Sequence, residues 1–392
     1  MSRRRIAVVT TSRADYSHLY WPLRLLSENP EVDLRLIAMA SHLSPEFGMT
    51  IREIEKDGFP VAARVESLLS SDSDVGMAKS IGTAVLSLAD VLGAMRPDLL
   101  LLIADRYEML APAAVALSLR IPIAHIEGGE ISEGAIDDAV RNALTKMSHI
   151  HFTSTEAARA RVIAMGEEPW RVHRAGAPSL DHLRRGRLLD RCEVEARCGL
   201  DLSVPPLLVA CHPVTLEPDA TAEAAALFAA LEKLAATAPI LFCFPNADAG
   251  SRALIDRTRE FLARHPQDRL FVNLDAVTYW SLLRCVDAMI GNSSSGIMET
   301  ASFALPTVNI GARQKGRERA RNVLDAEATP GCILARVEEA RSPEFRASLT
   351  GMTNPYGDGH AAERIVEVLT SAPLGPPLLV KRAVPTPAEN AP

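Results

Sequence analysis

The stretch that decides the fold class is DLLLLIADRYEMLAPAAVALSLRIPIAHIEGGEISEGAIDDAVRNALTKMSHIHFTST, residues 98–155. It contains three short apolar runs, at residues 98–105, 122–129 and 149–155, and each gap between them is long enough for a helix. Strands that are apolar along their whole length have both faces buried, as in a parallel sheet that lies between helices. The stretch therefore predicts an α/β fold with a doubly wound parallel sheet.

The same alternation continues on both sides of this stretch. It begins at residues 6–11 and 32–40, is interrupted by a charged segment at 184–205, and then restarts with five runs at 207–212, 239–246, 270–275, 288–293 and 306–311. We therefore predict two open α/β domains, residues 1–183 and 206–372, joined by a linker at 184–205. An amphipathic pattern at 361–371 predicts a closing helix, and the six prolines of residues 373–392 predict an extended or disordered tail.

The composition of the 392-residue chain excludes several classes of protein. With 42 basic and 49 acidic side chains the net charge is −7, so the basic excess of a general nucleic-acid-binding protein is missing. The six cysteines form no CxxC pair, which favours buried free thiols in a reducing compartment over a zinc site. The apolar run near the N-terminus is short, and no apolar run of 18 residues occurs. We expect a cytoplasmic protein without a metal, a nucleic-acid partner or a membrane partner.

Carboxylates gather where the first sheet should bind a ligand, at the carboxyl ends of its strands. Asp105 ends one strand and is followed by Arg106, and the next strand ends in His125 and Glu127. Residues two apart share a strand face, so His125 and Glu127 are expected to point the same way. Asp137 opens the following helix. Because clustered carboxylates repel each other, at least one should have a raised pKa and act as an acid or a base.

Several of these residues also have a purely structural interpretation. Asp137 and Asp138 can be N-terminal acids that complement a helix dipole. Glu130 can be an ordinary loop residue, and His125 can be a buried histidine held by hydrogen bonds. A functional role is favoured for the two carboxylates at adjacent strand ends.

The first strand runs into TTSRADYS, residues 10–17, without a GxGxxG motif. A nicotinamide dinucleotide site is therefore not expected, because the tight glycine turn under the pyrophosphate is missing. Arg13 and Ser17 can donate hydrogen bonds to an anion. Ser12 or Asp15 can instead simply cap the following helix.

The second domain offers groups that suit a nucleoside diphosphate. GNSSSG, residues 291–296, precedes a predicted helix, and Ser293 and Ser294 can grip a phosphate there. An ordinary serine N-cap is an equally good explanation. Glu299 can accept hydrogen bonds from ribose hydroxyls, and Arg313 can pair with the diphosphate.

Two further strand ends in the second domain carry polar residues. His212 ends the first strand, and across a closed cleft it would face the carboxylates, where it can protonate or orient a leaving diphosphate. Asn246 and Asp248 end the next strand and can contact the ligand at the rim. For Asp248 a capping role is as good an explanation.

Eight motifs follow one another along the chain: SRADYS, DRYEMLAPA, AHIEGGEISEGAIDDAVRNALTKMSH, GAPSLD, CHPVT, FPNADAGS, GNSSSGIMET and NIGARQKGRERARNV. In this order they resemble the hydrolysing UDP-N-acetylglucosamine 2-epimerases, with their bacterial sialic-acid and legionaminic-acid branches, over residues 3–370. The resemblance implies a GT-B architecture, in which two Rossmann-like domains enclose the active site. It also implies a C-terminal helix that crosses back onto the first domain.

The chemistry implied by the resemblance needs no redox cofactor. The proton at C2 of the sugar is removed, UDP leaves C1, and the resulting 2-acetamidoglucal is hydrated with inversion at C2. By their motifs, Asp105, Glu127 and Asp137 match the acid/base carboxylates, and His212 matches the histidine of HPV. The positions that match nucleotide, diphosphate or further active-site contacts are Arg13, Ser17, Arg106, His125, Ser293, Ser294, Glu299 and Arg313.

Two positions depart from the family pattern. Ala104 stands where Gly usually precedes Asp-Arg, a one-carbon change that a strand end can accommodate. Asn142 replaces the His of an RHAITK pattern, which leaves the sugar specificity open. The GTRPE-like and HGDT segments of the non-hydrolysing branch are missing, which favours release of a free sugar.

The expected reaction converts UDP-N-acetylglucosamine to N-acetylmannosamine and UDP, feeding nonulosonic-acid biosynthesis. UDP- or GDP-linked N,N′-diacetylbacillosamine is the alternative substrate, and the expected assembly is a homo-oligomer, a dimer or a tetramer. A GT-B glycosyltransferase would share the pocket but would need an acceptor. A sugar-nucleotide sensor would bind without turnover, and the complete set of carboxylates argues against it.

Overall fold

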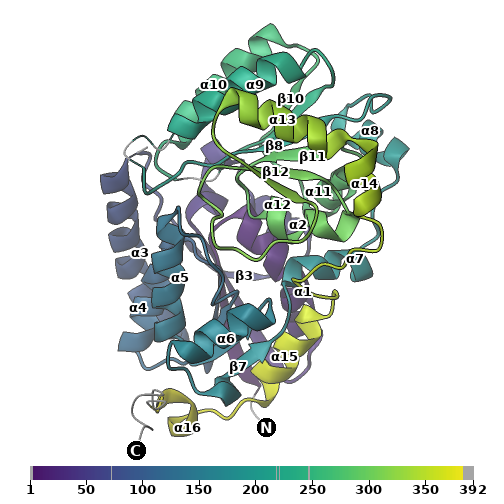
Figure 1. Ribbon diagram of the computed structural model, residues 1–392. Helices are drawn as coiled ribbons and strands as arrows, with labels where there is room; N and C mark the ends of the chain where they lie inside the picture. The colour runs from purple at the N-terminus through teal and green to yellow at the C-terminus, as the bar shows by residue number, and fades with distance from the viewer. Residues whose placement is uncertain (1–2, 72, 218, 220, 246–247, 383–392) are drawn as a thin grey trace, which may run out of the picture.

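The computed structural model describes residues 3–71, 73–217, 219, 221–245 and 248–382. Two parallel sheets packed against helices form two domains, one above the other in Figure 1. The first sheet has seven strands in the order β3-β2-β1-β4-β5-β6-β7, and the second has six in the order β10-β9-β8-β11-β12-β13. The predicted class, two doubly wound parallel-sheet domains of GT-B type, is confirmed.

The first domain contains the stretch from which the fold was predicted. Its strands are β1 (Arg4–Thr10), β2 (Val32–Met39), β3 (Val61–Val65), β4 (Leu99–Ile103), β5 (Ile123–Ile126), β6 (Ile150–Thr153) and β7 (Val172–Arg174). Its helices are α1 (Arg13–Glu28), α2 (Ile51–Lys56), α3 (Asp74–Met95), α4 (Leu110–Ser118), α5 (Ile136–Met147), α6 (Glu156–Ala164) and α7 (Asp181–Arg185). Every residue of β4, β5 and β6 is buried, as expected for central strands of a covered parallel sheet.

The second domain repeats this plan. Its strands are β8 (Leu207–Ala210), β9 (Ile240–Cys243), β10 (Arg269–Phe271), β11 (Ala288–Gly291), β12 (Thr307–Ile310) and β13 (Val323–Ala326). Its helices are α9 (Ala222–Leu234), α10 (Ser251–Arg264), α11 (Ala276–Leu283), α12 (Ser295–Met298), α13 (Pro330–Arg341) and α14 (Pro343–Ser348).

Each sheet has a switch point, where the strand order reverses. It lies between β1 and β4 in the first sheet and between β8 and β11 in the second. Ligands of open α/β sheets bind outside the carboxyl ends of the strands at such points. The residues that follow these strands in the two domains line one shared cavity.

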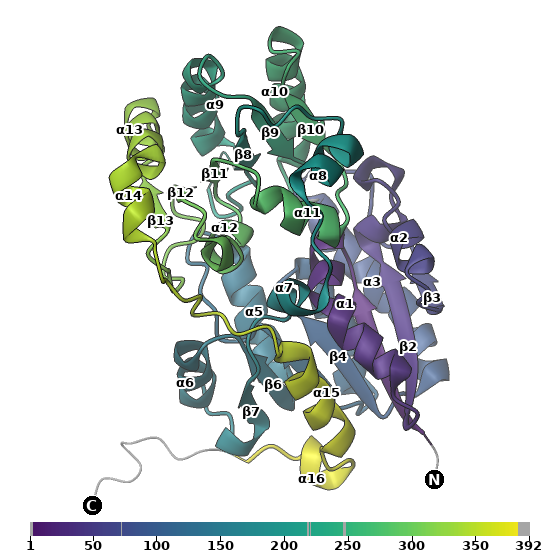
Figure 2. The same cartoon turned by 90° about the vertical axis from the view of Figure 1, so that its right-hand side faces the viewer.

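The chain returns to the first domain at its C-terminal end (Figure 2). Helix α15 (Ala361–Ser371) packs on α1, and Ile365 and Leu369 belong to the apolar core of the first domain. The carboxylate of Asp181 accepts hydrogen bonds from the first two N–H groups of α15, at 2.9 and 2.8 Å. These contacts fasten the end of the chain to the domain in which it began.

Four elements did not stand out in the sequence. The strands β3, β7 and β13 are interrupted by Arg64, His173 and Asp325, so none of them forms an unbroken apolar run. The charged segment predicted as a linker contains α8 (Arg191–Cys198), which starts with a capping box between Asp190 and Glu193. That Asp-x-x-Glu spacing is a readable helix start, hidden here by the high charge of the segment.

The prediction of an extended or disordered tail is wrong for residues 373–382. Helix α16 (Pro376–Leu379) buries Leu378 in the core of the first domain. The guanidinium of Arg171 donates hydrogen bonds to the carbonyls of Leu378 and Val380, both at 2.8 Å. Residues 383–392 of the predicted tail lie outside the described residues.

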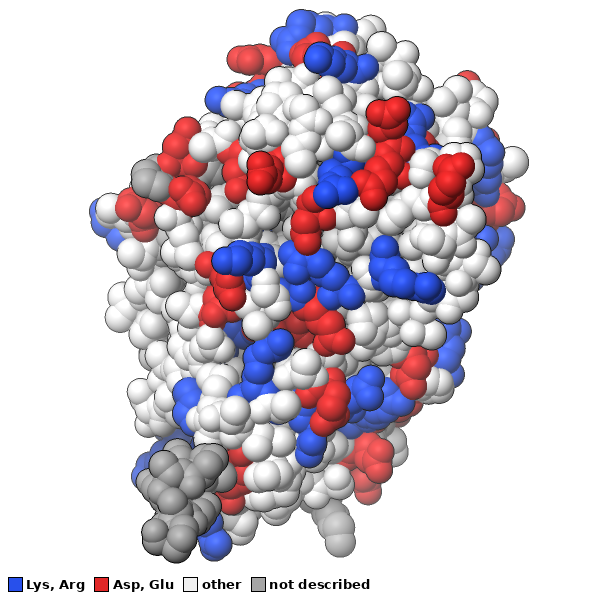
Figure 3. Space-filling view, viewed as in Figure 1, with Lys and Arg blue, Asp and Glu red and all other residues white. Residues whose placement is uncertain are grey.

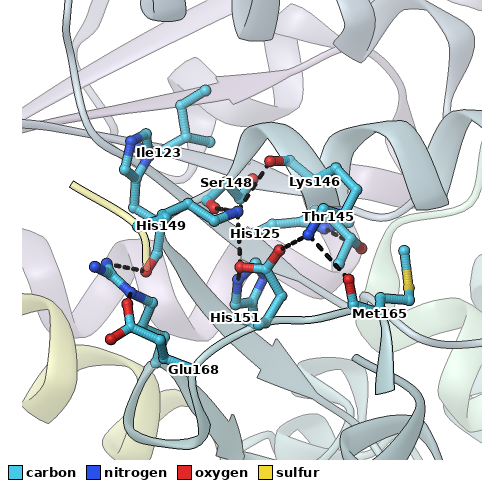
Figure 4. A network of polar contacts seen from close by, with 12 residues as sticks. Ile123, His125, Thr145, Lys146, Ser148, His149, His151, Met165 and Glu168 are labelled. Atoms are coloured by element: carbon cyan, nitrogen blue, oxygen red, sulfur yellow. Dashed lines mark hydrogen bonds and ion pairs between the residues drawn. The ribbon is translucent and has the colours of Figure 1, made fainter. Parts of the chain in front are cut away.

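A polar network beside β6 holds this segment, and Figure 4 shows the residues around it. Glu167 accepts from Lys146 Nζ at 2.6 Å and from His151 Nε2 at 3.1 Å, and it pairs with Lys381 Nζ at 2.7 Å. These contacts lower the pKa of Glu167 to about 2 against the opposing effect of its burial. The C-terminal segment thus supplies Lys381 to the group of charged side chains around Glu167, next to β6.

The structure also shows how charged side chains and cysteines are exposed. Acidic and basic side chains are interspersed over the face shown in Figure 3. All six cysteines are free, but the prediction that they are buried is wrong, since Cys192 is exposed and the others are half-buried.

Among the described helices, α3 alone is long and apolar enough to span a membrane, with a mean hydropathy of 1.4. Its Leu88 and Leu92 pack into the core.

Candidate active site

A cavity of about 480 Å³ lies between the two domains. This volume is in the range typical of ligand pockets. Asn246 lies outside the described residues, and His125 is buried away from the cavity. The other predicted site residues all line the cavity: Arg13, Ser17, Asp105, Arg106, Glu127, Asp137, His212, Ser293, Ser294, Glu299 and Arg313.

Asp105 follows a left-handed backbone turn at the end of β4. Ala104 has a φ of 57°, a conformation that costs an L-residue roughly 1–2 kcal/mol. Its carbonyl accepts a hydrogen bond from His125 Nε2 at 2.7 Å. The carboxylate of Asp105 forms a short ion pair with Nη2 of Arg141, which is buried in α5. The turn and the ion pair together fix the direction of this carboxylate.

His125 does not share a face with Glu127, contrary to the prediction. Strand β5 ends at Ile126, and Glu127 has a φ of 66°, so the two-residue alternation of the strand stops before it. His125 is fully buried, and burial lowers its pKa to about 4. It is the buried, hydrogen-bonded histidine of the structural interpretation, and it supports Asp105 through the carbonyl of Ala104.

Glu127 enters the cavity from the end of β5. Its Oε1 atom lies 2.7 Å from Nδ1 of His18, on α1. Burial alone raises the pKa of Glu127, but the charge of His18 and the hydrogen bond with it lower that pKa below its ordinary value. Glu127 is therefore a carboxylate at neutral pH, although it is almost completely buried.

Asp137 and Asp138 have different roles. Asp137 faces the cavity, and its Oδ2 atom pairs with Nη2 of Arg313 in the second domain at 3.1 Å. Burial raises the pKa of Asp137, and the charge of Arg313 opposes that rise. Asp138 instead accepts from the N–H of Ser132 at 2.8 Å and from Asn142 at 3.1 Å. Asp138 is thus an acid in the first turn of α5, as in the structural interpretation. Asn142, the position that departs from the family pattern, does not line the cavity.

The GNSSSG segment closes the opposite side of the cavity. Gly291 has a φ of 139°, and a Cβ there would collide with the backbone of β8, so the position requires glycine. The side chain of Asn292 bonds both the N–H and the carbonyl of His212, at 2.8 and 3.0 Å. Ser294 stands at the N-cap of α12 but makes no side-chain capping bond. Its hydroxyl is therefore not explained by an ordinary capping role.

Glu299 follows α12 and is buried at the cavity wall. Its Oε2 atom accepts a short hydrogen bond from Ser295, whose Oγ lies 2.5 Å from the hydroxyl of Tyr279. Its Oε1 atom lies 3.5 Å from Nε2 of His18. Both carboxylate oxygens are thus held from different directions.

Arg313 and Arg106 are two of the buried arginines that bring positive charge to the cavity. Arg313 donates from Nη1 to the carbonyl of Asn292 at 3.1 Å, and its Nε has no hydrogen-bond partner among the described residues. A buried donor without a partner is costly unless a ligand completes it. Arg106 pairs with Glu108 at 2.9 Å and, across the cleft, with Asp248 at 2.7 Å. The predicted rim residue Asp248 is therefore part of the interface between the domains.

His212 is surrounded by cations. Desolvation lowers its pKa well below the ordinary value, and the charges of Arg313, Arg106 and Arg13 lower it further. The imidazole is neutral at neutral pH. Of the two roles considered from the sequence, this state favours orienting a diphosphate over protonating it.

Among the residues that the sequence did not indicate, His18 and Arg317 line the cavity, and Arg141 holds the cavity residue Asp105. Arg141 lies four residues after Asp137 on α5, so helical spacing was an available signal for it. His18 directly follows Ser17 on α1, but neighbouring residues of a helix do not share a face, so spacing gave no signal for His18. Arg317 lies in an irregular segment after β12, where no periodicity indicates a direction. Its guanidinium reaches the first domain and donates to the carbonyl of Ile131 at 3.3 Å.

The matching family model, two relatives and a solved structure are all described as 2-epimerases. The family model described as UDP-N-acetylglucosamine 2-epimerase matches residues 24–370. A UDP-N,N′-diacetylbacillosamine 2-epimerase (hydrolyzing) of Legionella pneumophila is 36% identical over 380 residues, covering 96% of this chain and 98% of the relative. A GDP/UDP-N,N′-diacetylbacillosamine 2-epimerase (hydrolyzing) of Campylobacter jejuni is 35% identical over 348 residues, covering 88% and 90%. The UDP-GlcNAc 2-epimerase of Neisseria meningitidis, crystallised with UDP-GlcNAc, has the same fold, with a TM-score of 0.78 at 17% identity over 93% and 99% of the two chains.

Proposed function

The chain belongs to the UDP-N-acetylglucosamine 2-epimerase family, and we propose that this member hydrolyses a UDP-linked 2-acetamido sugar with inversion at C2. It is a UDP-sugar 2-epimerase; the proposal concerns the hydrolysis and the sugar. The observation that carries it is the distribution of charge around one cavity. Asp105, Glu127 and Asp137 of the first domain face Arg313 and the serines of the second.

The reaction consumes one water and releases the free epimeric sugar and UDP. In the first half, the C1–O bond to the diphosphate and the C2–H bond break, which leaves a 2-acetamidoglucal. In the second half, water adds its hydroxyl to C1 and a proton returns to C2 on the opposite face. One group must therefore accept the C2 proton and another must deliver one.

The following roles are proposed from the contacts of each residue. Glu127 is ionised and accepts the C2 proton. Departure of the diphosphate builds positive charge at C1 and acidifies C2, so a weakly basic carboxylate suffices. Arg313 and the serines bind the diphosphate, which draws Arg313 away from Asp137. Because the charge of Arg313 then no longer opposes the rise in the pKa of Asp137 that burial causes, Asp137 becomes protonated and delivers the proton to C2. Asp105, held by Arg141, accepts a proton from the water that adds at C1.

We assign the sugar as N,N′-diacetylbacillosamine, because both relatives named above act on it and match this chain over most of its length. UDP-N-acetylglucosamine, the first expectation from the sequence, is the second candidate and is supported by the description of the family model. In either case the free sugar would feed nonulosonic-acid biosynthesis in the cytoplasm.

The test is to incubate the protein with UDP-N,N′-diacetylbacillosamine, its GDP analogue and UDP-N-acetylglucosamine side by side in D₂O. We expect nucleotide release without any acceptor, the highest kcat/KM with the first donor, and deuterium at C2 of an inverted free sugar. A product without label at C2, or with retained configuration, would contradict the chemistry. A glycosyltransferase would release little UDP without acceptor, and a sensor would bind without turnover.

A further inference from the structure

His18 connects the two domains inside the cavity. From α1 of the first domain, its Nδ1 lies 2.7 Å from Oε1 of Glu127 and its Nε2 lies 3.5 Å from Oε1 of Glu299. Glu127 follows β5 in the first domain, whereas Glu299 follows α12 in the second. One imidazole ring thus joins the carboxylate proposed as the base to the carboxylate expected near the ribose.

The geometry defines the protonation state of this ring. An ionised carboxylate only accepts hydrogen bonds, so a ring with a carboxylate at each nitrogen carries both protons and is an imidazolium. Burial by itself lowers the pKa of His18, but the charges and hydrogen bonds of Glu127 and Glu299 outweigh it and raise that pKa to about 10. The cation is therefore present throughout the neutral pH range.

His182, on α7 and also packed against α1, shows the contrasting case. Its Nε2 donates to the carbonyl of Ser17 at 2.9 Å, and its Nδ1 accepts from the indole N–H of Trp21 at 3.2 Å. One donor and one acceptor define a neutral ring, and burial lowers the pKa of His182 to about 4. The two glutamates thus act on His18 beside a neutral histidine.

The helix that carries His18 and the glutamate of the second domain are both held in place. The N-terminus of α1, one turn before His18, is fixed by a capping box between Ser12 and Asp15. The far oxygen of Glu299 is held by Ser295, which contacts Tyr279. His18 therefore cannot follow one glutamate without losing the other.

We infer that His18 is a positioning residue for the proposed reaction: its contacts with both carboxylates keep Glu127 ionised and directed into the cavity, and make that state depend on the second domain. This inference rests on the proposed function, in which Glu127 accepts the C2 proton. His18 lies on a helix and not at a strand end, and it links Glu127 of the first domain to Glu299 of the second domain, where the nucleotide is proposed to bind.

Removing the cation should shift the pH dependence in a defined direction. Without His18, burial of Glu127 is opposed only by more distant charges, so its pKa rises. A base is active only above its pKa, so activity on the acid side of the profile is lost first. An opposite charge in direct contact shifts a carboxyl pKa by about one to three units. The acid limb of kcat/KM should therefore move up by about one pH unit or more in His18→Gln, whereas His18→Lys, which keeps a cation, should keep most of the limb.

The first experiment needs no turnover. We expect the histidine Cε1–H signals of the full chain, followed by NMR from pH 5 to 9, to include one ring that stays protonated above pH 8. That signal should vanish in His18→Gln, and its titration midpoint should fall in Glu299→Gln. His173→Gln, on β7, is the control and should remove a different signal. If no histidine stays protonated above pH 8, the bridge is disproved, whatever the enzyme turns over.

The second experiment is the pH profile with the best donor, together with KM and the melting temperature of each variant. An unshifted acid limb in His18→Gln, with activity lowered equally at every pH, would overturn the positioning role and leave a structural one. If the wild-type protein turns over no donor, the proposed function fails, and the NMR titration still decides whether the bridge exists.

Discussion

The two sheet edges that face the cavity are built from different backbone. In the first domain, Ala104 and Glu127 have φ angles of 57° and 66°, which L-residues adopt only at a cost. In the second domain, the left-handed positions at the ends of β11 and β12 are Gly291 and Gly311, with φ angles of 139° and 71°. Glycine takes such angles without a side-chain penalty. The edge with the carboxylates is strained, and the edge proposed to bind the diphosphate is relaxed.

The contacts around each edge explain the difference. The hydrogen bond from His125 to the carbonyl of Ala104 stabilises the left-handed backbone there. At Glu127 the backbone is stabilised by a hydrogen bond from its own N–H to the carbonyl of Phe152, at 2.7 Å. In the proposed reaction these bonds direct carboxylates at the reacting carbon, where the direction decides the rate. A diphosphate is held by several donors at once, so close approach of the backbone matters more there than one fixed side-chain direction.

The largest effect should come from the strained edge. We expect Asp105→Asn to lower kcat by about 100-fold or more, the loss typical of removing a positioned acid or base, and to change UDP affinity much less. Asp98→Asn, at the other end of the same strand, is the control and should keep wild-type turnover. Near-normal turnover of Asp105→Asn would remove Asp105 from the chemistry and with it the functional reason for the strain.

A smaller effect, and on a different quantity, should come from the relaxed edge. A charge-assisted contact is worth about 1.5–3 kcal/mol, so Arg313→Ala should weaken UDP binding by roughly ten- to hundredfold. Calorimetry measures the affinity, and the exposed Lys315→Ala two residues away serves as the control. Unchanged affinity with a lowered melting temperature would show that Arg313 only neutralises Asp137.

The smallest effect tests the strain itself. Ala104→Gly should raise the free energy of unfolding by about 1 kcal/mol, because it removes the cost of a left-handed alanine. Gly311→Ala should lower it, since a Cβ there would collide with Glu223 and the φ is left-handed. Urea unfolding measures both. An equal loss of stability in the two variants would show that the edges are not different.

Much of the fold was predictable because its signal is local. Runs such as residues 98–105 and 122–129 are apolar throughout, and a buried parallel strand between helices is the structure that fits them. The strands β3, β7 and β13 were missed because polar residues interrupt them, so they carry no such run. The tail was misread for a related reason: prolines predict no packing, yet Leu378 finds a place in the core.

The site was predictable to the extent that it follows from strand ends. Asp105, Glu127 and Arg313 were found because polar residues directly after buried strands meet at one edge. His125 was misplaced because alternation along a strand cannot show where a left-handed residue ends it. His18 was missed because nothing in α1 indicates that two carboxylates lie on either side of it.

The sequence by itself determined two parallel α/β domains and the polar residues at their strand ends, because hydrophobic periodicity acts over a few neighbouring residues. Only the tertiary structure decided which of those residues meet. Glu127 and His18 are 109 positions apart, and Arg313 and Asp137 are 176 apart on different domains. Such pairs depend on how one domain is placed on the other. That placement is set by packing across the cleft and by the return of α15 to α1, for which no local pattern exists.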